Sequence, residues 1–286
     1  MTASLGALAE VVDLLACPHC RQAFLLAPDG STLRCEQGHS FDVARQGYVN
    51  LLSAKPPRNA DTPAMVAARQ RFLSAGHYRP IADRLTELAS THGPRHPRLL
   101  EVGAGTGFYV SEVLQGLPGA RAIALDVSVA AARRAAGAHT HLGSVVADVW
   151  QRLPVADGGV DVLLDVFAPR NPAEFRRVLD SSGVLLIVTP EPEHLEEIRT
   201  PLQLLDIQPA KHEQLAAALS QGFTAVAQES LRFVVTLGVA AVRDLVAMGP
   251  NAFHLDEAAI SERAGTVPVP ARVTVAVNLS VWGPRP

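Results

Sequence analysis

The sequence predicts an α/β fold in which a small cysteine-rich module precedes a Rossmann-like, mostly parallel sheet of seven strands. Three observations lead to this prediction. All three cysteines of the 286-residue chain lie within residues 17–35. A glycine-rich loop follows the first apolar strand candidate after residue 97. From there on, short apolar segments alternate with segments of helical pattern, which is typical of βαβ units.

Three domains are expected along the chain. Residues 1–50 hold the cysteines and many turn residues and form the small module. Residues 51–97 are expected to be a helical connector, because apolar residues recur at helical spacing in 64–75 and 78–90. The connector ends in the breaker-rich run THGPRHPR, and residues 98–286 form the sheet domain.

Seven strand candidates follow the connector. The first five are short and apolar, as expected for parallel strands that are buried on both faces. Each of the first four is followed by a segment that can form a helix. The last two are longer and alternate in polarity, which suits an antiparallel pair that closes the sheet. The candidates are residues 98–104, 120–127, 141–149, 159–167, 183–190, 224–237 and 271–282.

The composition is that of a globular protein, with 48% apolar and 19% charged residues. No run of 18 or more apolar residues predicts a membrane span. The N-terminus is acidic and offers no clean cleavage site, so we expect no signal peptide and a cytoplasmic location. The net charge of -3 argues against a nucleic-acid partner. However, residues 1–98 hold 11 Lys+Arg and 8 Asp+Glu, a local excess of +3.

The cysteines form a metal-binding pattern. Cys17 and Cys20 are two residues apart, and Cys35 and His39 are three residues apart after a 14-residue spacer. A cytosolic chain rarely keeps disulfides, and three cysteines leave one unpaired. Zinc prefers four tetrahedral thiolate or imidazole ligands, so we expect a structural Cys3His site with no open position for water. His19 is a rival ligand, although it lies inside the first turn.

The glycine-rich loop has the pattern acidic-x-G-x-G-x-G. Glu101 is followed by Gly103, Gly105 and Gly107, with Thr106 inside the loop. Glycines allow the tight turn and let the backbone approach a ligand closely. Dinucleotide folds usually place the third glycine one residue later. The loop therefore favours the methionyl end of S-adenosylmethionine as the ligand.

Two carboxylates strengthen this interpretation. Asp126 ends the second strand candidate, where an acid can accept hydrogen bonds from the ribose hydroxyls of a cofactor. Asp148 lies at the end of the third, where it can accept from the adenine amino group. Alternatively, either carboxylate caps the next helix. Together, the loop and the two carboxylates predict a class I methyltransferase domain.

Several stretches of the chain are specific enough to suggest a family. They include CPHC, GHSFDVARQGYVNLL, AGHY, VADVW, VFAPRNP and VTPEPEHL. With them the chain resembles the RlmA family of 23S rRNA guanine-N1 methyltransferases, and most of all the branch that contains the tylosin-resistance enzyme TlrB. One departure is visible, because the family often has Asp where this chain has Glu101.

The resemblance implies zinc ligation by the four residues that the spacing selects. It also implies cofactor contacts from Tyr78, Thr106, Gly107 and His194, of which Tyr78 and His194 would not be selected from the residues alone. It further implies a homodimer that binds an rRNA hairpin in a basic cleft. A macrolide-resistance role is an expectation of the same kind.

The methyl acceptor is expected at the loop after the fourth strand candidate. If the acceptor is guanine N1, its proton must leave, so a base is needed. Asp165 could accept the proton, or it could be an ordinary strand-end carboxylate. Arg170 could steady negative charge on guanine O6 or bind phosphate, and Phe167 could stack on the base.

Five arginines of the N-terminal part are candidates for phosphate contacts, although ordinary surface charge is favoured for any one of them individually. Two alternative functions stay open. A small-molecule methyltransferase explains the sheet domain but gives the zinc module no task. An inactive RNA- or protein-binding protein is disfavoured by the intact loop and carboxylates. The five arginines are Arg34, Arg45, Arg58, Arg69 and Arg71.

Overall fold

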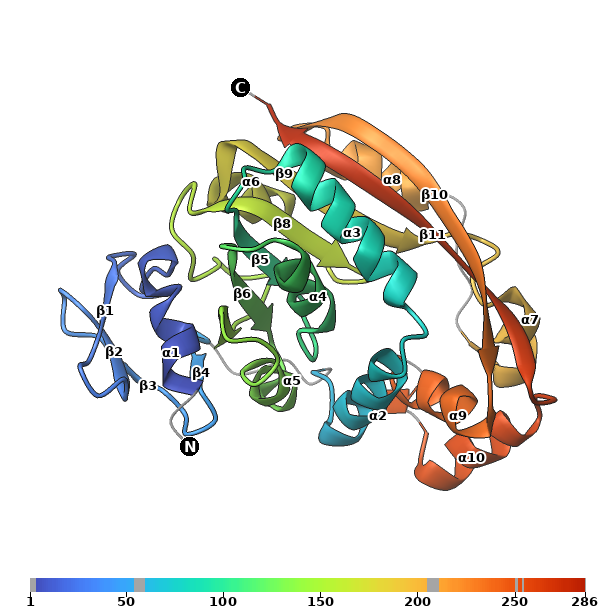
Figure 1. Cartoon of the computed structure of the whole chain (residues 1–286). Helices are drawn as coiled ribbons and strands as arrows, with labels where there is room; N and C mark the ends of the chain where they lie inside the picture. Colours follow the sequence, from blue (N-terminus) through green and yellow to red (C-terminus); the bar gives the residue numbers. More distant parts are fainter. Residues whose placement is uncertain (1–3, 54–59, 205–210, 250–251, 254, 286) are drawn as a thin grey trace.

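The structure is a computed structural model that describes residues 4–53, 60–204, 211–249, 252–253 and 255–285 (Figure 1). It contains an eight-stranded sheet in the order β10-β11-β9-β8-β5-β6-β7-β4 and a three-stranded sheet in the order β1-β2-β3. All seven predicted strands are present in the larger sheet. They are β5 (Arg98–Val102), β6 (Arg121–Asp126), β7 (Leu142–Val146), β8 (Val160–Val166), β9 (Leu179–Pro190), β10 (Phe223–Leu237) and β11 (Ala271–Pro284).

The central strands are parallel, and the late pair closes the sheet as predicted. β5 lies between β6 and β8 and is parallel to both. β9 is parallel to β8. β11 runs antiparallel to both β9 and β10. Because parallel strands end at one edge, the loops that follow β5, β6, β7 and β8 meet there.

Apolar residues of the central strands alternate between two cores, one on each face of the sheet. In β5, Leu99 belongs to the core under α3 and α4, whereas Leu100 and Val102 belong to the core under α6 and the N-terminal segment. This explains why the strands read as continuous apolar runs. The helices are α2 (Pro63–Ser74), α3 (Arg79–His92), α4 (Phe108–Gly116), α5 (Val129–Ala135), α6 (Pro172–Val178), α7 (Glu196–Leu202), α8 (Lys211–Leu219), α9 (Val239–Ala247) and α10 (Glu257–Gly265).

One helix prediction was wrong. The strands β5, β6 and β8 are followed by helices α4, α5 and α6, but residues 147–159 after β7 form turns. Pro154, Gly158 and Gly159 interrupt this segment, and Gly158 has a φ of +61°. A proline and a glycine pair disfavour helix. In the part of the chain that is described, no helix is long and apolar enough to cross a membrane.

The N-terminal segment is joined closely to the large sheet. The side chain of Val11 lies where a Cβ on Gly143 of β7 would sit, and the Asp13 carboxylate pairs with Arg121 at 2.6 Å. β4 (Tyr48–Asn50) adds an eighth, parallel strand beside β7. Contacts thus run across the domain division expected at residue 50. The other N-terminal elements are α1 (Ser4–Ala9), the 3-10 helix η1 (Val12–Leu14), β1 (Phe24–Leu26), β2 (Thr32–Cys35) and β3 (Ser40–Asp42).

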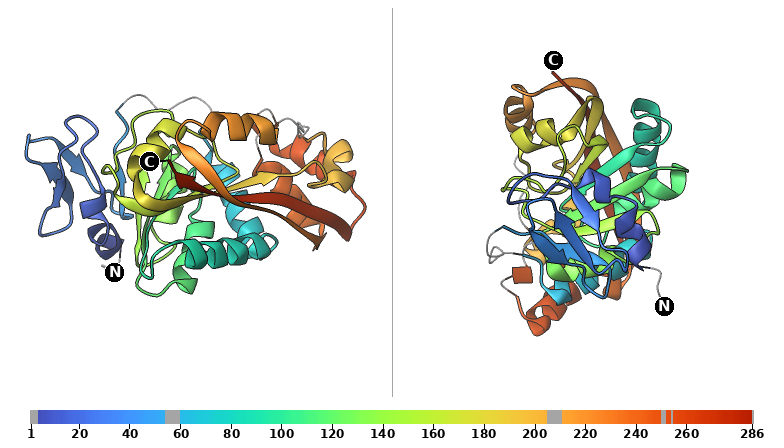
Figure 2. Two further views of the ribbon diagram at one scale, coloured as in Figure 1. Left: turned by 90° about the horizontal axis from the view of Figure 1, so that it is seen from above. Right: turned by 90° about the vertical axis from the view of Figure 1, so that its left-hand side faces the viewer.

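The three-stranded sheet and the helices α9 and α10 lie at opposite ends of the molecule (Figures 1 and 2). The strands β10 and β11 form a long twisted hairpin that reaches the α10 end. The carboxyl edge of the parallel strands lies between the two ends. A ligand at that edge can therefore be approached from the N-terminal module and from the helices of the other end.

Candidate functional site

The four predicted metal ligands come together at one point of the N-terminal module. The potential ligand atoms of Cys17, Cys20, Cys35 and His39 all lie within 4.8 Å of one another. The Cys35 Sγ lies 3.4 Å from the Cys20 Sγ and 3.3 Å from the His39 Nδ1. Tetrahedral zinc with its usual bond lengths places such atoms about 3.5–3.8 Å apart. The donor set and spacing therefore fit a structural zinc ion.

Two tight turns present these ligands. In the first, the Arg21 N–H donates to the Cys17 carbonyl at 2.8 Å. In the second, the Gly38 N–H donates to the Cys35 carbonyl at 2.9 Å, and Gly38 has a φ of +81° that favours glycine. His19 lies outside the ligand cluster, and its ring packs beside that of His39 with the ring centroids 5.0 Å apart.

The glycine-rich loop connects β5 to α4, and the backbone at three of its positions favours glycine. Gly103, Gly105 and Gly107 have φ values of +61°, +56° and +75°. A Cβ on Gly103 would also lie 2.7 Å from the Cβ of Ala168, in the loop after β8. The first glycine therefore lets the glycine-rich loop and the loop after β8 approach each other.

Glu101 lies beneath the loop and is fully buried. Its Oε2 accepts a hydrogen bond from the Val110 N–H of α4 at 3.1 Å. Burial raises the pKa of Glu101 to about 8, although the Val110 N–H opposes the rise. The side chain thus fixes the loop on α4 in a protonated form at neutral pH.

The two strand-end carboxylates lie at the carboxyl edge of the sheet. The half-buried Asp126 accepts from the Gly105 N–H through Oδ2 and from the Ser128 N–H through Oδ1, both at 2.8 Å. Ser128, rather than Asp126, caps α5. Asp148 is half-buried after β7, and its Oδ1 accepts from the Trp150 N–H at 3.0 Å. Asp126 is therefore tied directly to the glycine-rich loop.

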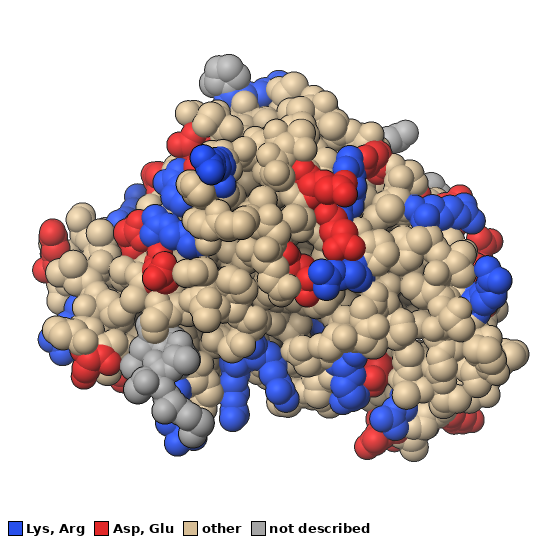
Figure 3. Space-filling view, viewed as in Figure 1, with Lys and Arg blue, Asp and Glu red and all other residues tan. Residues whose placement is uncertain are grey.

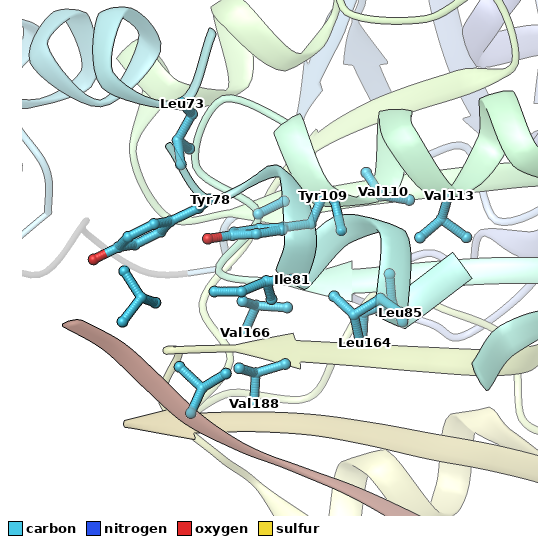
Figure 4. Close-up of a cluster of buried hydrophobic side chains, with 14 of the residues drawn as sticks. Leu73, Tyr78, Ile81, Leu85, Tyr109, Val110, Val113, Leu164, Val166 and Val188 are labelled. Atoms are coloured by element: carbon cyan, nitrogen blue, oxygen red, sulfur yellow. The ribbon is translucent and has the colours of Figure 1, made fainter. Parts of the chain in front are cut away.

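Tyr78 and His194 meet although they are 116 residues apart. The Tyr78 hydroxyl lies 3.2 Å from the His194 Nε2, and both side chains are buried. Burial lowers the pKa of His194 to about 4, so its ring is neutral at pH 7. Tyr78 lies beside Tyr109 over an apolar cluster from α3, α4, β8 and β9, with both hydroxyls pointing the same way (Figure 4).

Asp165 and Arg170 form an ion pair next to this cluster. The Asp165 carboxylate is fully buried at the end of β8, and its Oδ1 lies 3.1 Å from an Arg170 terminal nitrogen. Burial raises the pKa of Asp165 to about 7, and Arg170 limits the rise. A carboxylate that titrates near neutral pH can serve as a general base.

Buried polar atoms without hydrogen-bond partners are concentrated at the same edge. Several buried side-chain N and O atoms of the described residues have no hydrogen-bond partner. Apart from one atom of Glu112, they belong to residues at the ends of β5, β8 and β9 or in the loops that follow these strands. Such atoms are rare in folded proteins and are satisfied by a ligand or by water. The edge therefore fits a polar ligand. These residues are Thr106, Asp165, Arg170, Thr189 and His194.

The predicted phosphate contacts fall into three groups. Arg34 and Arg45 are exposed and have no ion pair within the residues that the structure describes. Arg58 lies outside the described residues. Arg69 and Arg71 of α2 are instead paired with the carboxylates of Asp61 and Asp244.

Comparison with known proteins identifies the two parts of the chain together. Residues 15–58 match the family model described as "RlmA, N-terminal", a zinc ribbon. The chain is 45% identical over 97% of its length to the 23S rRNA (guanine(748)-N(1))-methyltransferase of Streptomyces fradiae, covering 99% of that protein. The chain belongs to the RlmA-type 23S rRNA (guanine-N1-)-methyltransferase family.

Further likenesses agree with this assignment. A putative 23S rRNA (guanine-N(1)-)-methyltransferase of Micromonospora griseorubida is 44% identical over 96% of this chain and 99% of its own length. Among solved structures, the MccD protein matches 72% of this chain and 98% of its own, with a TM-score of 0.50 and 20% identity, which concerns the fold alone. The family accounts for S-adenosylmethionine and zinc as the two bound groups.

The sequence predicted Arg69 only as a candidate phosphate contact, not as a residue beside the glycine-rich loop. Arg69 lies against Gly105 of the glycine-rich loop, where a Cβ on that glycine would be 3.3 Å from its side chain. Because 36 residues separate the two positions, no local signal in the sequence could have paired them.

Proposed function

We propose that the protein transfers the methyl group of S-adenosylmethionine to N1 of a guanine in a hairpin of 23S rRNA. The observation that carries this proposal is the 45% identity to the Streptomyces fradiae enzyme over 97% of the chain. The likeness includes the zinc module as well as the cofactor loop. A small-molecule methyltransferase would account for the loop alone.

The cofactor would be held by the loop Gly103–Gly107, by Asp126 and Asp148, and by the Tyr78–His194 pair. S-adenosylmethionine supplies, when bound, an electrophilic methyl group on a positively charged sulfur. The chain's own task is to align the acceptor with that methyl and to exclude water. The buried aromatic and apolar side chains around Tyr78 suit the second task.

Neutral guanine carries a proton on N1, so the base must be deprotonated for N1 to attack. We assign the proton to the Asp165 carboxylate, whose pKa of about 7 matches this role. Once N1 has lost this proton to Asp165, its electron pair would be available to the methyl group that S-adenosylmethionine supplies when bound. Arg170, already 3.1 Å from Asp165, would steady the negative charge that develops on guanine O6.

We expect Phe167 to hold the guanine base. It follows β8 directly, has a φ of +55°, and is 39% exposed despite its apolar ring. Its ring centroid lies 6.3 Å from that of Tyr78 and 5.9 Å from that of His194. Its backbone is in the left-handed region, and its ring is exposed at the site, which suits stacking on an unstacked RNA base.

The RNA backbone would be held by arginines outside the catalytic edge. Arg34 and Arg45 lie on the N-terminal module, and Arg133 and Arg134 are exposed on α5. Basic side chains line the lower edge of the molecule around α5 (Figure 3). With ribosomal RNA as the substrate, we place the protein in the cytoplasm, and the family resemblance supports a homodimer.

Mass mapping of 23S rRNA from cells with and without the gene tests this function. We expect a methyl group on guanine N1 that appears only with the gene, and we propose guanine 748, as named for the Streptomyces fradiae relative. Tylosin susceptibility of the same strains tests the resistance role. An unchanged rRNA methylation map would contradict the proposal and leave a small-molecule acceptor as the alternative.

A further inference from the structure

The side chain of Arg69 lies over the middle glycine of the cofactor loop. The Cδ and one terminal nitrogen of Arg69 are each 3.3 Å from the position that a Cβ on Gly105 would take. Gly105 has a φ of +56°, which already disfavours other residues. The glycine therefore makes room for an arginine of α2 as well as allowing the turn.

Two contacts hold the Arg69 guanidinium in this place. One terminal nitrogen pairs with the Asp61 carboxylate, and the other donates to the Met248 carbonyl at 2.9 Å. The Asp61 carbonyl in turn accepts from the Ser128 hydroxyl at 2.7 Å. Ser128 also donates its N–H to Asp126, so Arg69 is connected to the cofactor side of β6.

The guanidinium keeps donors to spare. It carries five N–H groups, and two are used by Asp61 and Met248, which leaves three within the described structure. The side chain is 25% exposed, so these donors are not sealed in the core. A planar guanidinium with free donors recognises a carboxylate through two parallel hydrogen bonds.

The surrounding charges make Arg69 the suitable cation for such a ligand. The ionisable side chains next to the loop include the carboxylic acids Glu101 and Asp126, which would repel an anion when ionised. Arg170 and Arg69 are each paired with one carboxylate, that of Asp165 and that of Asp61. They differ in position, because the Arg69 side chain lies directly against Gly105 of the glycine-rich loop.

We propose that Arg69 binds the α-carboxylate of S-adenosylmethionine, with Asp61 holding the guanidinium over Gly105. The inference rests on the proposed function, because it takes S-adenosylmethionine to be the loop's ligand. It adds the recognition of the one anionic group of that cofactor. Charge-assisted hydrogen bonds of this kind contribute roughly tenfold to hundredfold to affinity.

The test compares the binding of S-adenosylmethionine and of its decarboxylated analogue by isothermal titration calorimetry. The intact protein should bind S-adenosylmethionine roughly tenfold to hundredfold more tightly than the analogue. Arg69→Ala should lose this preference by weakening only the carboxylated form. Arg71→Ala is the matched control, because Arg71 lies two residues along α2 and pairs with Asp244 instead.

Equal preference in the intact protein and Arg69→Ala would overturn the inference while leaving the proposed function standing. No preference in the intact protein would overturn it as well. No binding of either compound by the intact protein would contradict the proposed function itself. If circular dichroism shows that Arg69→Ala does not fold, Arg69→Lys decides: it keeps the charge without the paired donors, and an undiminished preference would overturn the inference.

Discussion

The Tyr78 hydroxyl and the His194 Nε2 lie 3.2 Å apart and join the helical connector to the loop after β9. Tyr78→Phe removes this bond without changing the volume of the ring. If the pair shapes the cofactor site, S-adenosylmethionine should bind roughly threefold to tenfold more weakly, since a neutral hydrogen bond is of that strength. Calorimetry measures the change, and Tyr48→Phe in β4 is the control. Unchanged affinity in Tyr78→Phe would contradict a cofactor role for the pair.

The pH dependence of methyl transfer should report on Asp165. Its carboxylate must be ionised to accept a proton, and burial places its pKa at about 7. We therefore expect the single-turnover rate to rise with pH and to level off above about 7. Asp165→Asn should lower the rate roughly a hundredfold to ten-thousandfold and abolish this rise. Asp180→Asn, which changes an acid at the start of β9, should behave like the intact enzyme. A rise that persists in Asp165→Asn would assign the base elsewhere.

Glu101 should make the fold less stable as the pH rises. Burial raises its pKa in the folded state to about 8, above the usual 4.5, so the folded state binds the proton more tightly than the unfolded state. Its stabilising contribution is complete below about 4.5 and is lost as the pH rises to about 8. Glu101→Gln is always neutral, so the intact protein should lose unfolding free energy relative to it, on the order of a few kcal/mol, between pH 5 and 8. Urea denaturation at both pH values measures this difference, and the opposite trend would refute it.

Metal analysis should separate His39 from its neighbour His19. We expect one zinc per chain, and His39→Ala should lose most of it because the fourth ligand is gone. His19→Ala should keep the metal, since His19 only packs beside the His39 ring. Cys17 and Cys35 belong to the same core as Phe24 and Leu33, so chelation should also lower the melting temperature. Retention of zinc by His39→Ala together with its loss in His19→Ala would exchange the two roles.

Salt dependence should show whether the N-terminal module holds RNA. Arg34 and Arg45 are exposed and have no ion pair among the described residues. If both neutralise phosphates, Arg34→Ala/Arg45→Ala should reduce the slope of log affinity against log salt by roughly 1.4 to 1.8. Filter binding of an rRNA hairpin measures the slope. Arg272→Ala, on the exposed side of β11, should leave it unchanged. An unaltered slope in the double variant would place the RNA on another face.

Much of the architecture could be predicted because its signals are local. Short apolar runs predict the strands of the sheet. Two short spacings around turns predict the zinc ligands. β4 escaped prediction because only three residues pair, and their partners in β7 are 96 positions away. A helix was expected after β7, but residues 147–159 form turns because Pro154, Gly158 and Gly159 disfavour helix.

The candidate site was harder to predict than the fold. Glu101, Asp126 and Asp148 follow from their places at strand ends, whereas Tyr78 and His194 became visible only through the family resemblance. Their meeting depends on how α3 packs against β9, which no short sequence pattern encodes. Arg69 was predicted only as a candidate phosphate contact, and its partner Asp61 is eight residues away on an irregular segment.

The pairing of β4 with β7 connects the zinc module directly to the sheet whose carboxyl edge holds the candidate site. Tyr48, Val49 and Asn50 are in register with residues 144–146, two positions before Asp148. If the module binds an rRNA hairpin, this connection would fix the distance between the bound part of the hairpin and the target base. Inserting one base pair between the two in the RNA should then present a different nucleotide to Asp165, rather than simply weaken binding.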